Sequence, residues 1–100
     1  MNLRPGIDDV TPKHVATAEA IVGALGGPAN ITSLEHCVTR LRIALADLRL
    51  LDDTRLRSHP AVLGVLRRET LQIVVGPAAV TPFATAMAQL IAAAAANDTP

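Results

Sequence analysis

Residues 38–45 alternate between core-type and polar side chains, and this alternation constrains the fold more than any other stretch of the chain. One set of alternate positions holds Thr39, Leu41, Ile43 and Leu45, and the other holds Arg40, Arg42 and Ala44. Successive side chains of a β-strand point to opposite faces of its sheet. The pattern therefore predicts a strand with one buried face and with both arginines on the opposite face.

A shorter, mixed pattern over residues 31–36 precedes this strand by very few residues. Two strands so close in sequence indicate a β-hairpin. Cys37 lies at or beside its turn and is the only cysteine of the chain. A turn position would lift the thiol out of the sheet and into solvent.

Two amphipathic helices are predicted on either side of the strand-rich middle. Thr11 can cap the first, Pro12 suits its first position, and Gly26-Gly27-Pro28 ends it, because proline cannot continue a helix. Its apolar side chains recur at helical spacing at Val15, Ala18, Ile21, Val22 and Leu25. The second helix shows the same spacing at Val80, Phe83, Ala84, Met87, Leu90 and Ile91.

A second hairpin is predicted in the C-terminal half of the chain. Residues 61–66 and 70–75 are rich in β-forming side chains and are joined through Arg67-Arg68-Glu69. Gly76-Pro77 stops the last strand, since proline has no backbone N–H to donate within a sheet.

A short helix is predicted between the hairpins, capped by Asp52 or Asp53 and ending before His59-Pro60. The predicted order is thus α-β-β-α-β-β-α. It favours an α+β fold in which helices cover one face of a four-stranded antiparallel sheet. We expect one domain over residues 12–96, a flexible leader over 1–11 and a flexible tail over 97–100.

The composition excludes several classes of function. Nine basic residues balance nine acidic ones, and Trp and Tyr are absent, so we expect no nucleic-acid partner. One cysteine and three scattered histidines do not form a zinc site, and we expect no metal and no cofactor. No apolar run approaches the roughly 20 residues that span a bilayer, and the N-terminus lacks an apolar signal core. These features predict a soluble, cytoplasmic protein.

The thiol and its neighbours have competing interpretations. Free cysteine is among the most buried residue types, so an inert Cys37 is the default. Arg40 and Arg42 favour a reactive thiol instead, because nearby positive charge stabilises the thiolate. The arginines could equally keep a solvent face polar. His36 adjoins the thiol, but neighbouring strand residues point to opposite faces, so we interpret it as context rather than as a catalytic partner.

The motif Cys37-Val38-Thr39-Arg40-Leu41-Arg42 resembles the centre of the B domain (enzyme IIB) of glucose-, N-acetylglucosamine- and β-glucoside-type permeases of the bacterial phosphotransferase system. The resemblance covers about residues 13–92 and includes Leu25-Gly26-Gly27, Asn30-Ile31, Gly64-Val65 and Leu71-Gln72-Ile73-Val74-Val75-Gly76-Pro77. The chain departs from the family at residues 67–70, where members often have glycine or asparagine. This departure leaves the geometry of the second turn open.

The resemblance implies a phosphorelay. Cys37 would accept a phosphoryl group from a phosphohistidine of the A component (IIA) and pass it to a sugar, glucose or N-acetylglucosamine, bound by the membrane-embedded C component (IIC). Arg40 and Arg42 would hold the phosphoryl group during transfer to sugar, and backbone N–H groups of Val38 and Thr39 would bind its oxygens. The chain would then be a phosphocysteine-dependent sugar phosphotransferase that docks at the inner face of the membrane through IIC.

Other functions fit parts of the sequence. A regulatory module of the same fold would use the phosphorylation state of Cys37 to hold another protein. A small thiol-based redox protein fits the cationic surroundings of Cys37, although a resolving cysteine is absent. We expect IIA and IIC as separate polypeptides, or this chain as one domain cut from a larger permease. The Thr39 hydroxyl has a secondary role at most, because its side chain falls on the core face.

Overall fold

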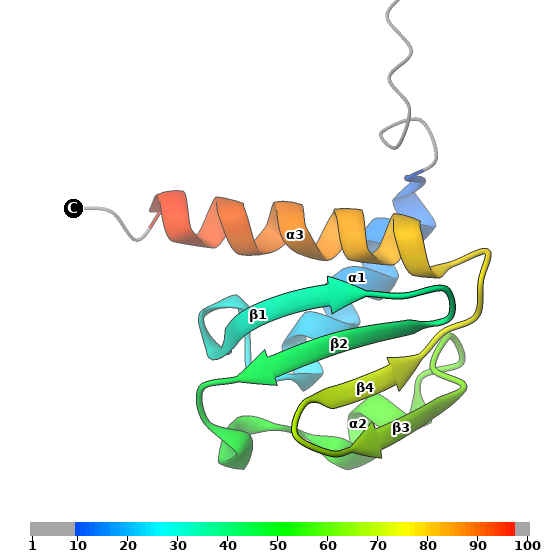
Figure 1. Cartoon of the computed structure of the whole chain (residues 1–100). Helices are drawn as coiled ribbons and strands as arrows, with labels where there is room; N and C mark the ends of the chain where they lie inside the picture. Colours follow the sequence, from blue (N-terminus) through cyan, green and yellow to red (C-terminus); the bar gives the residue numbers. More distant parts are fainter. Residues whose placement is uncertain (1–9, 98–100) are drawn as a thin grey trace, which may run out of the picture.

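In the computed structural model, which describes residues 10–97, helices cover one face of a four-stranded sheet (Figure 1). The elements follow in the order α1 (Pro12–Ala24), η1 (Pro28–Asn30), β1 (Ile31–His36), β2 (Arg40–Leu45), η2 (Leu48–Leu50), α2 (Asp53–Ser58), β3 (Gly64–Arg67), β4 (Leu71–Val74) and α3 (Val80–Asn97). This order confirms the predicted α-β-β-α-β-β-α arrangement and adds two short 3-10 helices, η1 and η2. Most of the predicted leader (1–11) and tail (97–100) lies outside the described residues.

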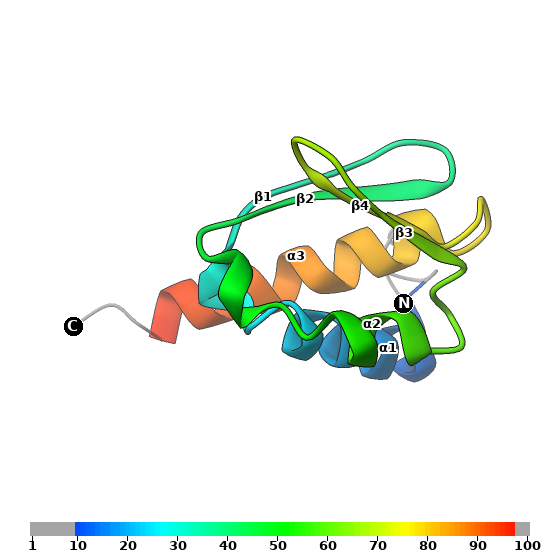
Figure 2. The same cartoon turned by 90° about the horizontal axis from the view of Figure 1, so that it is seen from below.

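The sheet has the strand order β1-β2-β4-β3, and each neighbouring pair is antiparallel. Its central strands β2 and β4 bury Leu41, Ile43 and Ile73 completely on one face. Figure 2 shows α1, α2 and α3 together on that side, with the other face uncovered. The predicted α+β fold is therefore confirmed, and strand alternation places Arg40 and Arg42 on the uncovered face.

The first helix begins at the predicted cap. The Thr11 hydroxyl accepts from the backbone N–H of His14 at 3.3 Å, and the His14 ring nitrogen Nδ1 accepts from the Thr11 backbone N–H at 3.0 Å. The same imidazole meets the buried ring of Phe83 edge-on, with the ring centroids 5.5 Å apart. His14 therefore caps α1 and joins it to α3.

Two strands begin later than predicted. The strand expected over residues 38–45 begins at Arg40, because Val38 and Thr39 belong to the hairpin connection. The strand expected over residues 61–66 is Gly64–Arg67, since the Val62 N–H donates to the His59 carbonyl and holds the preceding residues in a turn after α2. Each shift moves a boundary without changing the order of elements.

The turn between β3 and β4 forms without glycine or asparagine. The Arg68 N–H donates to the Thr70 carbonyl at 3.2 Å, and across the described residues every positive φ belongs to a glycine. The second turn therefore closes with the residues present at 67–70, although these depart from the glycine or asparagine that members of the resembled family often have. The short helix α2 has the predicted cap as well, because the Asp52 carboxylate accepts from the Arg55 N–H at 3.0 Å.

Asn30 is the buried polar side chain among the described residues, with 4% of its surface exposed. Its Nδ2 donates to the carbonyls of Leu25 at 2.8 Å and Asp47 at 3.0 Å, and its Oδ1 accepts from the Asp47 N–H at 2.9 Å. These bonds join the end of α1 to the segment that follows β2. They hold one helix and one central strand in fixed relation at the end of the sheet remote from Cys37.

Replacing Asn30 by alanine should lower the free energy of unfolding by about 2–4 kcal/mol, because it removes the side-chain partner of the buried Leu25 carbonyl and of the part-buried Asp47 N–H. Urea unfolding followed by circular dichroism measures the change. Gln89→Ala, on an exposed position of α3, is the control and should stay within about 0.5 kcal/mol of the parent. Equal stability of the two variants would contradict a structural role for the Asn30 bonds.

Candidate functional site

Cys37 occupies the connection between β1 and β2, as the sequence predicted, and is half-buried. Its backbone N–H donates to the Arg40 carbonyl at 3.0 Å, which closes the connection into a tight turn. The sulfur Sγ lies 3.8 Å from the same carbonyl oxygen. The thiol is thus neither sealed in the core, as the inert interpretation requires, nor raised fully into solvent.

Thr39 anchors this turn to the rest of the sheet. Its carbonyl accepts two backbone bonds, from the N–H of Val75 at 3.0 Å and from that of Gly76 at 3.2 Å. Gly76 has φ of 91°, a left-handed conformation that favours glycine. The turn bearing Cys37 is therefore held to the end of β4 through Thr39 on one side and Val75 and Gly76 on the other.

An open hollow of about 380 Å³ lies in front of the thiol. His36, Cys37 and Val38 line it from the hairpin, Pro77 lines it from the connection after β4, and Val80 and Thr81 line it from the start of α3. Val38 is 75% exposed, the largest exposure among the described large apolar side chains. This rim leaves the sulfur accessible from outside and gives an approaching protein an apolar surface to contact.

His36 lines the same hollow as Cys37, although strand parity predicted that the two would point apart. β1 ends at His36, so the alternation of a strand does not extend to the next residue. His36 and Cys37 thus line one hollow, but among the hydrogen bonds of the described residues none joins His36 to the thiol.

The pKa of the Cys37 thiol is lowered from its ordinary value. The largest cause is a hydrogen bond from the backbone N–H of Thr39, which stabilises the thiolate; partial desolvation opposes it, and the backbone of Arg40 lowers the pKa further. The positive charges of Arg42 and then Arg40 contribute least. The turn backbone therefore stabilises the thiolate more than the charges of Arg40 and Arg42 do, although the sequence pointed to the two arginines.

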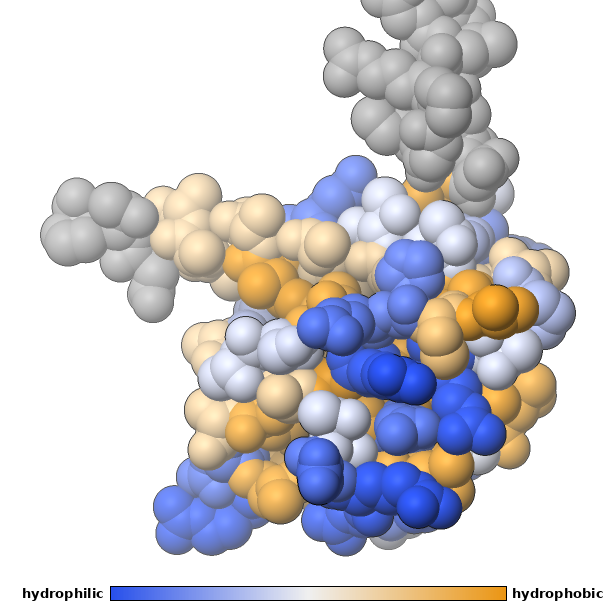
Figure 3. Space-filling view, in the orientation of Figure 1, coloured by the Kyte–Doolittle hydropathy of each residue, from blue (hydrophilic) through white to orange (hydrophobic). Residues whose placement is uncertain are grey.

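Both arginines lie on the uncovered face of the sheet, as predicted. Arg42 is exposed and stands opposite Glu35 on β1 and Gln72 on β4. Arg40 is half-buried, and its Nη1 donates to Oε1 of Gln72 at 2.9 Å. Figure 3 looks onto this face and shows hydrophilic side chains gathered across it.

Gln72 is the polar residue that the sequence reasoning did not single out. It lies between Leu71 and Ile73, which are buried against the helices, so alternation along residues 71–75 would have placed it on the arginine face. Its contact with Arg40 depends on the pairing of β2 with β4, which a sequence pattern does not specify.

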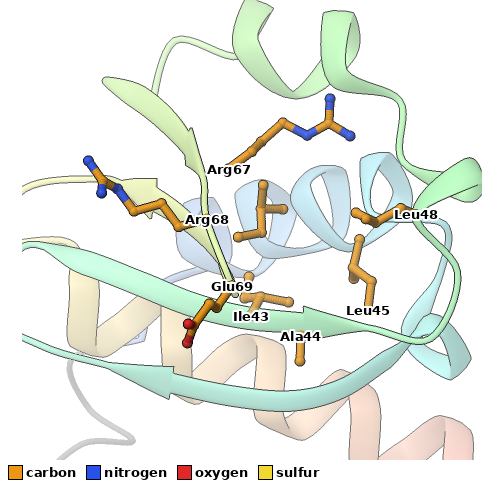
Figure 4. Close-up of a pocket in the computed structure, with 8 residues that line it drawn as sticks. Ile43, Ala44, Leu45, Leu48, Arg67, Arg68 and Glu69 are labelled. Carbon is orange, nitrogen blue, oxygen red and sulfur yellow. The ribbon is translucent and has the colours of Figure 1, made fainter.

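A second hollow, of about 120 Å³, lies at the opposite end of the sheet (Figure 4). Ile43, Leu45, Leu48 and Leu71 form its apolar part, and the β3–β4 turn supplies its charged rim. The side chains of Arg67 and Arg68 diverge in Figure 4, and Glu69 extends in a third direction. This hollow holds no nucleophile and does not adjoin Cys37.

The part of the chain that the structure describes contains no cluster of three His, Cys, Asp or Glu side chains able to hold a metal ion. Over the same residues, 10–97, none of the helices has both the length and the apolar character needed to cross a membrane.

Comparisons with known proteins point to one family. Residues 19–52, which include Cys37, Arg40 and Arg42, match the family model described as "phosphotransferase system, EIIB". MurNAc-GlcNAc-specific EIIBC components of the phosphotransferase system from Staphylococcus aureus strains USA300 and NCTC 8325 are each 44% identical to the chain over 78 residues. The match covers 78% of this chain and 16% of either relative, so the chain spans about a sixth of the length of these relatives.

A solved structure gives the same indication. One domain of the phosphotransferase system IIabc component from Clostridium difficile superimposes with a TM-score of 0.72 and 26% sequence identity. The superposition covers 78% of this chain and 82% of that one. The likeness therefore extends over most of the sheet and helices described above.

Removing both arginine charges should leave the thiol pKa below its ordinary value, because the Thr39 N–H is the largest cause of the lowering. In an Arg40→Gln/Arg42→Gln double variant the pKa should rise from that of the parent, since two favourable charges are lost, but only part of the way. Ultraviolet absorbance of the thiolate against pH measures it. If the pKa of the double variant instead returned to that of an ordinary thiol, the arginines would be the main groups that stabilise the thiolate.

Proposed function

Because this chain belongs to the EIIB family of the phosphotransferase system, we propose that it carries a phosphoryl group on Cys37 between a IIA phosphohistidine and a sugar bound by a membrane IIC component. The observation that carries the proposal is an accessible thiol whose thiolate is stabilised by the turn backbone, placed beside a face with two arginines. A phosphoryl carrier needs such a nucleophile together with donors for the phosphoryl oxygens.

Two transfers make up the proposed reaction. In the first, the Cys37 thiolate attacks phosphorus, an S–P bond forms, the P–N bond of the phosphohistidine breaks, and the imidazole nitrogen keeps the electron pair. In the second, a sugar hydroxyl attacks phosphorus, the S–P bond breaks, and the thiolate leaves with its electron pair while the hydroxyl proton passes to a base outside this domain. The lowered thiol pKa supports both steps, because the thiolate is the nucleophile in one and the leaving group in the other.

The two kinds of donor have separate roles in this proposal. The N–H of Thr39, which stabilises the thiolate, and that of Val38 in the same turn would bind oxygens of the phosphoryl group on Cys37. Arg40 and Arg42 would hold the group as it moves to the sugar, since guanidinium donors make strong, charge-assisted bonds to phosphate. Catalysis then consists of positioning and charge stabilisation.

The relatives bear on the partners and the sugar. The two Staphylococcus aureus proteins are named as EIIBC components specific for MurNAc-GlcNAc. By this similarity we favour a sugar with an N-acetylglucosamine unit over glucose, with the choice made by IIC. The domain would act at the inner face of the membrane while docked on IIC, and the apolar rim around Val38 would contact IIA.

Incubating the protein with phosphorylated IIA should add one phosphoryl group to the parent and none to Cys37→Ser, because serine lacks a stabilised anion at this position. Intact-protein mass spectrometry measures the addition, and acid and base stability separates phosphocysteine from phosphohistidine. Labelling of Cys37→Ser to the parent level would overturn the proposal. Labelling of the parent without sugar phosphorylation in IIC-containing membranes would favour the regulatory module instead.

Arg40→Ala and Arg42→Ala should each accept phosphate from IIA within about twofold of the parent but deliver it to sugar about 10- to 100-fold more slowly. The reason is that the acceptance step relies on the turn backbone, whereas delivery needs charge on the departing group. Rapid-quench assays of the two half-reactions measure the rates. Arg68→Ala, an exposed arginine at the far end of the sheet, is the matched control and should change neither. Equal loss of both steps in the Arg40 and Arg42 variants would contradict these roles.

A further inference from the structure

The two arginines of the uncovered face differ in how they are held. Arg40 donates from Nη1 to Oε1 of Gln72 at 2.9 Å and is half-buried. Arg42 is exposed and, within residues 10–97, has no side-chain hydrogen bond or ion pair, although Glu35 is its cross-strand neighbour. One guanidinium is therefore restrained by the sheet, and the other is free to move.

Strand register explains which arginine is restrained. Arg40 pairs with Val74 and Arg42 pairs with Gln72, so the Arg40–Gln72 bond runs diagonally across β2 and β4. A diagonal neighbour lies within reach of long side chains. The contact joins the two central strands, which are the most firmly held part of the sheet, so Gln72 itself stands on a rigid support.

We propose that Gln72 is the positioning residue for Arg40: its amide oxygen fixes the guanidinium on the uncovered face, with the remaining donors directed to a phosphoryl group during transfer to sugar. This inference rests on the proposed function of Cys37. A guanidinium has five N–H donors, so a bond to Gln72 occupies one and leaves four for phosphate oxygens. Ordering the side chain in advance removes an entropic cost from the transfer step.

The electrostatics of the free thiol agree with this arrangement. Arg40 is nearer to Cys37 in the sequence, yet its charge lowers the thiol pKa less than that of Arg42 does. A guanidinium held against β4 rather than over the sulfur accounts for this order. Arg40 would therefore act mainly when a sugar-bearing partner meets the uncovered face, and little while IIA transfers its phosphoryl group to the thiol.

A double-mutant cycle tests the coupling between the two residues. Gln72→Met keeps the side-chain length but removes the acceptor, and should slow phosphoryl delivery to sugar about tenfold while acceptance from IIA stays within about twofold. In an Arg40→Ala background the same substitution should change delivery by less than about twofold, because the residue it positions is gone. Gln89→Met, on exposed α3, is the matched control and should leave both steps unchanged. Independent, additive losses for Arg40→Ala and Gln72→Met would overturn the inference.

A second measurement needs no phosphoryl transfer. In the unphosphorylated protein, rotation of the Arg40 guanidinium, followed by nitrogen-15 NMR, should be slow in the parent and at least about threefold faster in Gln72→Met. The Arg42 guanidinium should rotate equally fast in both. Unchanged rotation of Arg40 would refute the positioning role even if Cys37 proves to be a phosphoryl carrier. A different result would refute the proposed function: Cys37 is not phosphorylated, although the Arg40 guanidinium rotates faster in Gln72→Met. The Arg40–Gln72 contact would then be established, but its role in phosphoryl transfer would be refuted.

Discussion

Thr39 is the residue on which the geometry of the site depends. Its carbonyl accepts from Val75 and Gly76 at the end of β4, while its N–H is directed to the sulfur of Cys37. One residue thereby ties the thiol-bearing turn to a central strand and supplies the main stabilisation of the thiolate. The side chain has little part in either contact, so the sequence around Cys37 specifies this site through backbone conformation more than through functional groups.

This division has a physical basis. A backbone N–H that stabilises the thiolate acts on it directly and is fixed by the sheet, whereas the charge of a partly or fully exposed arginine is weakened by water and salt. In the proposed reaction, the arginines would therefore remain available for the more highly charged phosphoryl group, because they are not needed to activate the thiol. A site that accepts a group and then releases it benefits when the groups that activate the thiol and the groups that hold the transferred group lie on separate parts of the structure.

The sequence predicted the order of elements, the one-sided sheet and the turn position of Cys37, because caps, helix breakers and strand alternation are local properties. It also placed Arg40 and Arg42 on one face correctly. It did not locate the start of β3, which depends on the Val62 N–H bonding to His59 after α2. Nor did it identify Gln72 or the carbonyl of Thr39, since both contacts arise where β2 and β4 run side by side, and η2, α2 and β3 separate these strands in the chain.

The hairpin has two accessible sides, and this offers a way for one thiol to serve two partners. The apolar hollow beside Val38 opens between the hairpin and the start of α3, on the helix side of the sheet. The arginines and Gln72 occupy the uncovered face. A phosphoryl donor that docks in the hollow would reach the sulfur without breaking the Arg40–Gln72 contact. A phosphoryl acceptor that approaches the uncovered face would instead contact the Arg40 guanidinium, which Gln72 already holds in place. The alternation along residues 38–45 thus separates the two surfaces, because the side chains that build the core leave the intervening arginines on the opposite face.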